Sequence, residues 1–213
     1  MQTIMSNTLN KKHETMDLNL TINENDINGS FNEIAMELMN NWAIQIESKQ
    51  YRIAEIEFYY NSEFHIDPYA HGHALQNKTG KWYFHGSGLD LTIGGNGSSG
   101  GILIRAIYDF DRKNYIYGPL NCVTELFSHL PGIYDNKSNI SFGLIKANEN
   151  DFMHEDPIAA PRVGLNPAKD KEKCEALYRF LIMPKYKHAE KTKIEASMIK
   201  LEYDEDVIKK IWG

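Results

Sequence analysis

The densest group of chemically active side chains lies between residues 51 and 73, in the segment YRIAEIEFYYNSEFHIDPYAHGH. Its alternating apolar residues predict a β-strand that runs directly into a polar loop. Carboxylates, imidazoles and phenols gather here: Glu55, Glu57, Glu63, Asp67, His65, His71, His73, Tyr51, Tyr59, Tyr60 and Tyr69. Because a strand end followed by a loop commonly presents catalytic or binding groups, we expect the functional site here.

The two glutamates of the predicted strand, Glu55 and Glu57, have two possible interpretations. Strict alternation places them on one face, with Ile53 and Tyr59, and leaves the other face apolar. Such a face is ordinarily exposed and solvated. The alternative is that the strand delivers the carboxylates to the polar loop. Arg105 is the one charge in a later predicted strand and could pair with either glutamate across the sheet.

Metal binding is another interpretation of the same loop. The imidazole and carboxylate groups of His65, Asp67, His71 and His73 suit zinc, iron or manganese. However, pairs of this kind are frequent in polar loops, and the chain contains no HExxH motif. A metal-dependent hydrolase therefore stays open as a function, although we expect no cofactor.

Composition limits the classes of protein. A chain of 213 residues with 42% hydrophobic residues can form one domain with a sizeable core. The net charge of -6 counts against a general attraction to nucleic acid. Cys122 and Cys174 form no CxxC motif, which indicates a reducing compartment without disulfides. No apolar run reaches about 18 residues, so we expect a cytoplasmic protein that does not enter membranes.

The pattern of elements predicts the fold class. Residues 1–30 read as a polar, partly ordered extension, and residues 31–213 as the single domain. An apolar repeat over residues 31–42 predicts a helix, with Ser30 as its N-cap and Glu33 completing a capping box. Three prolines predict a loop over residues 150–168. Strands are expected at 43–47, 51–59, 81–85, 89–93, 102–108, 141–146 and 177–183, and further helices at 121–130 and 204–212. This mixture predicts an α+β domain with a mainly antiparallel sheet.

A glycine-rich stretch, residues 95–100, formally matches GxGxxG. A dinucleotide fingerprint requires a helix after the loop, whose N-terminus binds the phosphates. Here a strand is predicted to follow, so we interpret the stretch as a hairpin turn.

Several segments together resemble the alkyladenine (3-methyladenine) DNA glycosylase family. In chain order they are LMNN, YRIAEIEFY, DPYAH, GKWYF, ILIRAI, YGPLNCV, APRVGLN and ALYRFLI, and they extend over residues 31–183 with shorter spacers than in that family. The resemblance implies a curved antiparallel sheet flanked by helices. It also implies hydrolysis of the N-glycosidic bond of damaged or modified purines in DNA.

The resemblance implies a role for each matching residue. Glu57 matches the glutamate that activates the attacking water, and Arg105 matches the arginine that supports it. The walls that bind the extruded base match Tyr59, His71, Tyr83 and His85. The chemistry is consistent, because a carboxylate can activate water and stabilise an oxocarbenium-like transition state. Aromatic walls suit an extruded base, since stacking contributes about 1 to 3 kcal/mol per base.

The chain departs from the family at the hairpin that enters the DNA minor groove. The family places a bulky side chain there, whereas this chain has Gly86-Ser87-Gly88. Together with the acidic net charge, this departure weakens the expectation of DNA as a partner. The alternative function is a pocket protein that binds a nucleoside-like small molecule, or a protein partner, without cleaving DNA.

Overall fold

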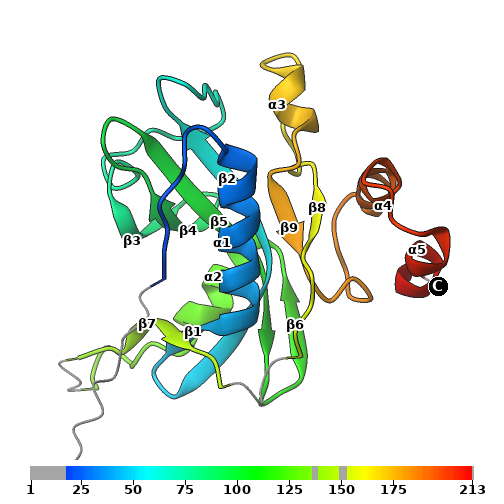
Figure 1. Cartoon of the computed structure of the whole chain (residues 1–213). Helices are drawn as coiled ribbons and strands as arrows, with labels where there is room; N and C mark the ends of the chain where they lie inside the picture. The colour runs from blue at the N-terminus through cyan, green and yellow to red at the C-terminus, as the bar shows by residue number, and fades with distance from the viewer. Residues whose placement is uncertain (1–17, 136–138, 149–152, 213) are drawn as a thin grey trace, which may run out of the picture.

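A curled antiparallel sheet organises the computed structural model, which describes residues 18–135, 139–148 and 153–212 (Figure 1). Its strands in the described residues are β1 (Trp42–Ile46), β2 (Lys49–Asn61), β3 (Thr79–His85), β4 (Gly88–Ile93), β5 (Ser99–Asp109), β6 (Asn114–Tyr117), β7 (Phe142–Lys146), β8 (Ile158–Ala160) and β9 (Arg179–Leu181). The helices are α1 (Ile27–Asn41), α2 (Pro119–Phe127), α3 (Lys171–Glu175), α4 (Lys191–Lys200) and α5 (Glu205–Trp212). The predicted α+β class with an antiparallel sheet is confirmed.

Strand β2 lies at the centre of the sheet. It pairs along one edge with β5, and along the other edge first with β1 and then with β9. The pairing with β5 shifts in register on both sides of Glu55, which marks a bulge. As a result Ile53 packs in the hydrophobic core with Ile56, while Glu55 contacts Arg105. The predicted common face of Ile53 and Glu55 is therefore wrong, because the bulge interrupts the alternation.

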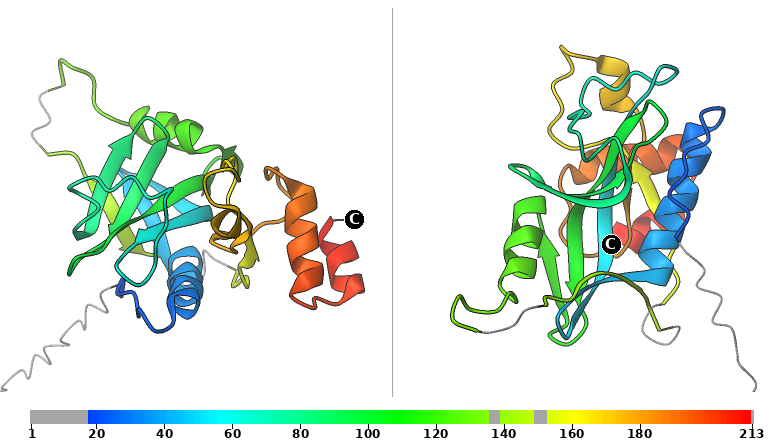
Figure 2. Two further views of the ribbon diagram at one scale, coloured as in Figure 1. Left: turned by 90° about the horizontal axis from the view of Figure 1, so that it is seen from above. Right: turned by 90° about the vertical axis from the view of Figure 1, so that its left-hand side faces the viewer.

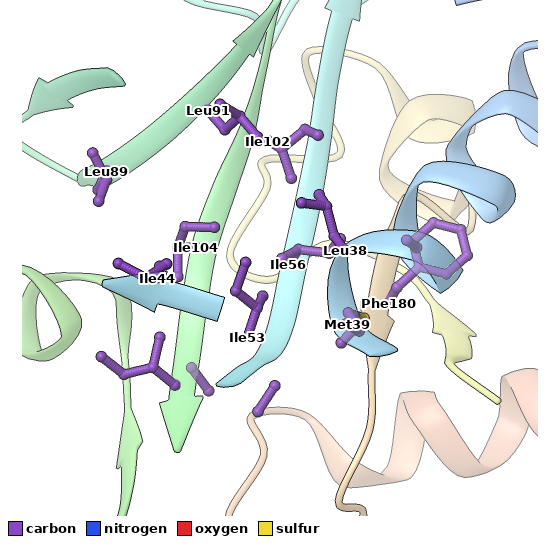
Figure 3. Close-up of a cluster of buried hydrophobic side chains, with 14 of the residues drawn as sticks. Leu38, Met39, Ile44, Ile53, Ile56, Leu89, Leu91, Ile102, Ile104 and Phe180 are labelled. Carbon is purple, nitrogen blue, oxygen red and sulfur yellow. The ribbon is translucent and has the colours of Figure 1, made fainter. Parts of the chain in front are cut away.

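Helices α1 and α2 lie on opposite sides of the sheet, as both views in Figure 2 show. Helix α1 covers β1 and β2, and its Phe31 stacks on Phe58 with ring centroids 4.3 Å apart. Figure 3 shows Leu38 and Met39 of α1 beside Ile56 in this core. Helices α4 and α5 pack on a smaller apolar cluster next to β8 (Figure 1). Successive residues of β2 are buried, so both faces of this strand are covered.

The start of α1 differs from the prediction. The helix begins at Ile27, and the Asp26 side chain caps it by accepting a hydrogen bond from the N–H of Gly29 at 2.9 Å. Ser30 lies inside the helix and donates its hydroxyl hydrogen to the carbonyl of Asp26. The predicted Ser30 cap is thus wrong, because an aspartate four residues earlier caps the helix first. Residues 1–17 of the predicted extension lie outside the described residues, but Leu20 is buried.

The region between α2 and the C-terminus contains elements that local pattern did not predict. The short strand β8 lies within the predicted loop and exists because it pairs with β9. Helices α3 and α4 were also not predicted, nor was strand β6, which precedes α2. By contrast, the interpretation of residues 95–100 as a turn is confirmed by a bridge between Gly95 and Ser98. In the described part of the chain, no helix has the length and apolarity needed to cross a membrane.

Candidate functional site

A cavity of about 380 Å³ lies where β2, β4 and β5 meet the loops after β2 and β8. This volume falls in the range of small-ligand pockets. Four of the predicted site residues line it: Tyr59, His71, His85 and Arg105. Glu57 and Tyr83 are not among the lining residues; each lies behind side chains that are. The loop and strands named by the sequence therefore do converge on one cavity.

Glu57 is fully buried and receives three hydrogen bonds. Its Oε2 accepts from the Tyr59 hydroxyl at 2.8 Å and from Arg105 Nη1 at 3.2 Å. Its Oε1 accepts from the backbone N–H of Val163 at 2.7 Å. Because all three donors belong to residues that line the cavity, the carboxylate lies directly beneath the cavity wall. The solvated-face interpretation of the glutamates is wrong.

Arg105 joins Glu57 to the second glutamate of the strand. Its Nε donates to Glu55 Oε1 at 3.0 Å, so one guanidinium bridges both carboxylates. Glu55 has two further partners, Arg179 Nε at 2.9 Å and His188 Nδ1 at 2.7 Å. The interpretation of Arg105 as an ion pair across the sheet is confirmed. Buried charges of both signs thus offset one another beneath the cavity.

The two glutamates have opposite pKa shifts although they are two residues apart. Burial raises the pKa of Glu57, and the opposing effects of Arg105, Val163 N–H and the Tyr59 hydroxyl do not cancel it. Burial also acts to raise the pKa of Glu55, but the His188 hydrogen bond and nearby positive charges outweigh it, so that pKa is lowered. Two neighbouring carboxylates whose pKa values are shifted in opposite directions are typical of sites in which only one of them accepts a proton.

An aromatic stack supports the imidazoles of the cavity wall. Tyr83 stacks on His85 with ring centroids 4.8 Å apart and on His73 with centroids 4.4 Å apart. His71 meets His85 edge to face at 4.7 Å. Tyr83 thus lies next to His71 and His85, which line the cavity, but is not itself among the lining residues. Its predicted place as a direct wall for a base stays a prediction.

Asp67 and His65 serve the loop rather than a shared metal site. Asp67 forms a buried ion pair with Arg162, with Oδ2 and Nη1 2.6 Å apart. The Arg162 guanidinium also lies over the Tyr59 ring at 4.6 Å. His65 is buried beside Lys173 instead. Among the described residues, His65, Asp67, His71 and His73 therefore do not form the predicted common metal-binding group.

A different group of metal-ligating side chains occurs in the described residues. His71, His85 and Asp90 place one ligand atom each within 4.8 Å of one another, and all three line the cavity. Asp90 was not predicted, since a single aspartate in a strand gives no local signal. Arg162 and Val163 were also missed as site residues, although the segment APRVGLN that carries them was noted for its resemblance.

Comparison with known proteins gives a related sequence but indicates no function. No family model matches this chain. The chain is 27% identical, over 189 residues, to an uncharacterized protein of Acanthamoeba polyphaga mimivirus, and the match covers 71% of this chain and 85% of the relative. The resemblance to the glycosylases, and the roles it implies, therefore stay predictions.

Proposed function

We propose that this protein is an N-glycosylase acting on damaged or modified purines in DNA, with Glu57 as the water-activating base. The observation that carries the proposal is the convergence of Glu57, Tyr59 and Arg105 at one cavity wall. The cavity also has aromatic and imidazole surfaces, Tyr59 and His71, that suit stacking against a base.

The proposed reaction uses the buried carboxylate of Glu57 as the final acceptor of the water proton. Water adds its oxygen to the sugar C1′ atom as the bond from C1′ to the base nitrogen breaks. The water proton passes to Glu57, and the departing base takes the bonding electrons. A raised pKa makes Glu57 a stronger base than an ordinary glutamate. Arg105 keeps the carboxylate in place. The Tyr59 hydroxyl lies between Glu57 and the cavity and relays the proton, taking it from water as it gives its own to Glu57.

A second candidate function is supported by the turn between β3 and β4. Gly86-Ser87-Gly88 carries no bulky side chain, and Ser87 lines the cavity. The net charge of -6 also provides no general attraction to DNA phosphates. Binding of a nucleoside-like small molecule without cleavage is therefore the alternative to glycosylase activity.

The test compares Glu57→Gln with the matched control Glu63→Gln, whose side chain is exposed and lies outside the cavity lining. Both variants and the wild type are assayed on duplexes containing hypoxanthine or a methylated purine, with abasic sites as the readout. We expect Glu57→Gln to lose activity about 100-fold or more, while Glu63→Gln keeps it. Equal rates in all three proteins would overturn the catalytic assignment.

Because Glu57 is buried, its replacement could reduce folding. Circular dichroism therefore accompanies each assay, and Tyr59→Phe serves as a milder variant that removes only the hydroxyl donating to Glu57. Titration with an abasic-site duplex and with free nucleosides separates the two functions. Tight nucleoside binding, weak duplex binding and no cleavage by wild type would support the alternative function.

A further inference from the structure

The carboxylate of Asp90 is unusual among the buried carboxylates of the described residues. Its side chain is almost completely buried, and its hydrogen-bond partners there are Gln76 Nε2 and His85 Nε2, each at 3.0 Å. Every other buried carboxylate in the described part of the chain contacts an arginine: Glu55, Glu57, Asp67 and Asp109. A buried charge is costly unless a cation compensates it. Among the described residues, no lysine or arginine forms an ion pair with Asp90, whose salt-bridge partner is His85.

The imidazoles of His71 and His85 lie beside Asp90, where such a cation would bind. His85 Nε2 is 3.0 Å from Asp90 Oδ1. One ligand atom from each of His71, His85 and Asp90 lies within 4.8 Å of the others. Ligand atoms of a tetrahedral zinc ion are about 3.4 Å apart, given bonds of about 2.1 Å. The pair formed by His85 and Asp90 already has nearly this spacing. His71 is exposed, so its side chain can turn inward to complete the site.

From these contacts we propose that His71, His85 and Asp90 bind one Zn²⁺ ion in the cavity wall. Two imidazoles and one carboxylate are suitable zinc ligands, whereas Mg²⁺ prefers oxygen ligands. Three protein ligands leave a coordination position open, and here it faces the cavity because all three side chains line it. The ion would bind an oxygen or nitrogen atom of the molecule that occupies the cavity.

The neighbouring residues orient the ligands as outer partners of a metal site do. Gln76 holds Asp90 Oδ2 and leaves Oδ1 for the ion. Gly101 of β5 gives the carboxylate its space, since a Cβ at that position would lie 2.4 Å from Asp90 Oδ2. Tyr83 stacks on His85 and holds its ring plane.

Zinc binding requires a change of tautomer at His85. Its Nδ1 accepts a hydrogen bond from Ser87 N–H at 3.2 Å, so without metal the ring proton is on Nε2 and is directed at Asp90. Coordination through Nε2 moves that proton to Nδ1, with no net proton release. Ser87 N–H, in an exposed turn, then bonds to water instead. The tautomer of His85 is therefore a spectroscopic marker of the site.

The experiment titrates ZnCl₂ into the full chain, freed of metal with a chelator, and measures heat of binding. His71→Ala is compared with the matched control His73→Ala, whose imidazole stacks on Tyr83 but does not belong to the cluster. We expect one zinc ion per wild-type or His73→Ala chain, and an affinity about tenfold or more weaker in His71→Ala. Equal affinities in all three proteins would overturn the proposal.

A second measurement records long-range ¹H–¹⁵N spectra of the histidine rings with ZnCl₂ or MgCl₂. Zinc should transfer the His85 proton from Nε2 to Nδ1 in the wild type, whereas magnesium should leave it unchanged. This readout does not require activity and so is independent of the proposed glycosylase function. A His85 ring that keeps its proton on Nε2 with zinc bound would place the ion elsewhere and refute the site.

Discussion

Replacing Asp67 with asparagine tests how strongly the buried ion pair beside the cavity stabilises the fold. Neither the Asp67 nor the Arg162 side chain is exposed, and two hydrogen bonds of 2.6 and 3.2 Å join them. Asparagine has nearly the same shape as aspartate, so Asp67→Asn removes the charge without creating a cavity. The guanidinium is then left buried without its counter-charge.

The expected cost follows from that burial. Removing one partner of a buried pair costs about 3 to 5 kcal/mol of unfolding free energy. For a chain of this size, 1 kcal/mol corresponds to about 2 to 4 °C in Tm, so Tm should fall by roughly 6 to 20 °C. Urea denaturation and a thermal scan both measure the effect. Asp111→Asn is the control, since Asp111 pairs with Lys49 at an exposed position and should change stability little.

A double-mutant cycle isolates the pair from its surroundings. Arg162→Met removes the cation but keeps an unbranched side chain, and the double variant lacks both charges. The cycle should give a coupling energy of about 1 to 3 kcal/mol between residues in direct contact. A coupling near zero, or an Asp67→Asn variant as stable as Asp111→Asn, would refute the reasoning that this pair stabilises the loop after β2.

The remaining predictions concern single groups whose surroundings differ sharply. Burial raises the pKa of Glu57, so the folded protein binds that proton more tightly than the unfolded chain does. The unfolding free energy of the wild type should therefore fall relative to that of Glu57→Gln as pH rises through the folded-state pKa. Urea denaturation of both proteins from about pH 4 to about pH 8 measures this difference. A difference in unfolding free energy that does not change with pH would contradict the prediction. Burial raises the pKa of Cys122 to about 12, so its thiol should not react with a thiol reagent in native protein at neutral pH. The reagent should modify only the half-buried Cys174 in native protein, and both cysteines after denaturation. Rapid native labelling of Cys122 would show that α2 opens. Gly101→Ala places a Cβ 2.4 Å from the buried Asp90 Oδ2 of β4 and should lower the unfolding free energy by about 1 to 3 kcal/mol. Gly143→Ala is the control, because a Cβ there meets open space. Equal unfolding midpoints for the two variants would show that β5 adjusts freely.

Much of the sheet was predictable from sequence because its signals are local. Alternation marked β2 and β5, and short turns such as Gly86 to Gly88 marked antiparallel neighbours. The prediction that Arg105 pairs with a glutamate of β2 also succeeded, because strands paired in register bring opposite side chains together. Short elements escaped: β8 has three residues and depends on β9 for its hydrogen bonds.

The sequence by itself determined which chemical groups the chain contains and that β2 ends at a polar loop. Tertiary structure alone decided their partners, since contacts between residues far apart in sequence leave no periodic signal. Arg162 and Arg179 reach back more than 90 positions to Asp67 and Glu55 and make burial of those carboxylates possible. The same folding pairs Asp67 with Arg162 and leaves Asp90 beside two imidazoles. Local propensity thus determines where the strands form, whereas the need to pair buried charges determines which side chains meet at the site.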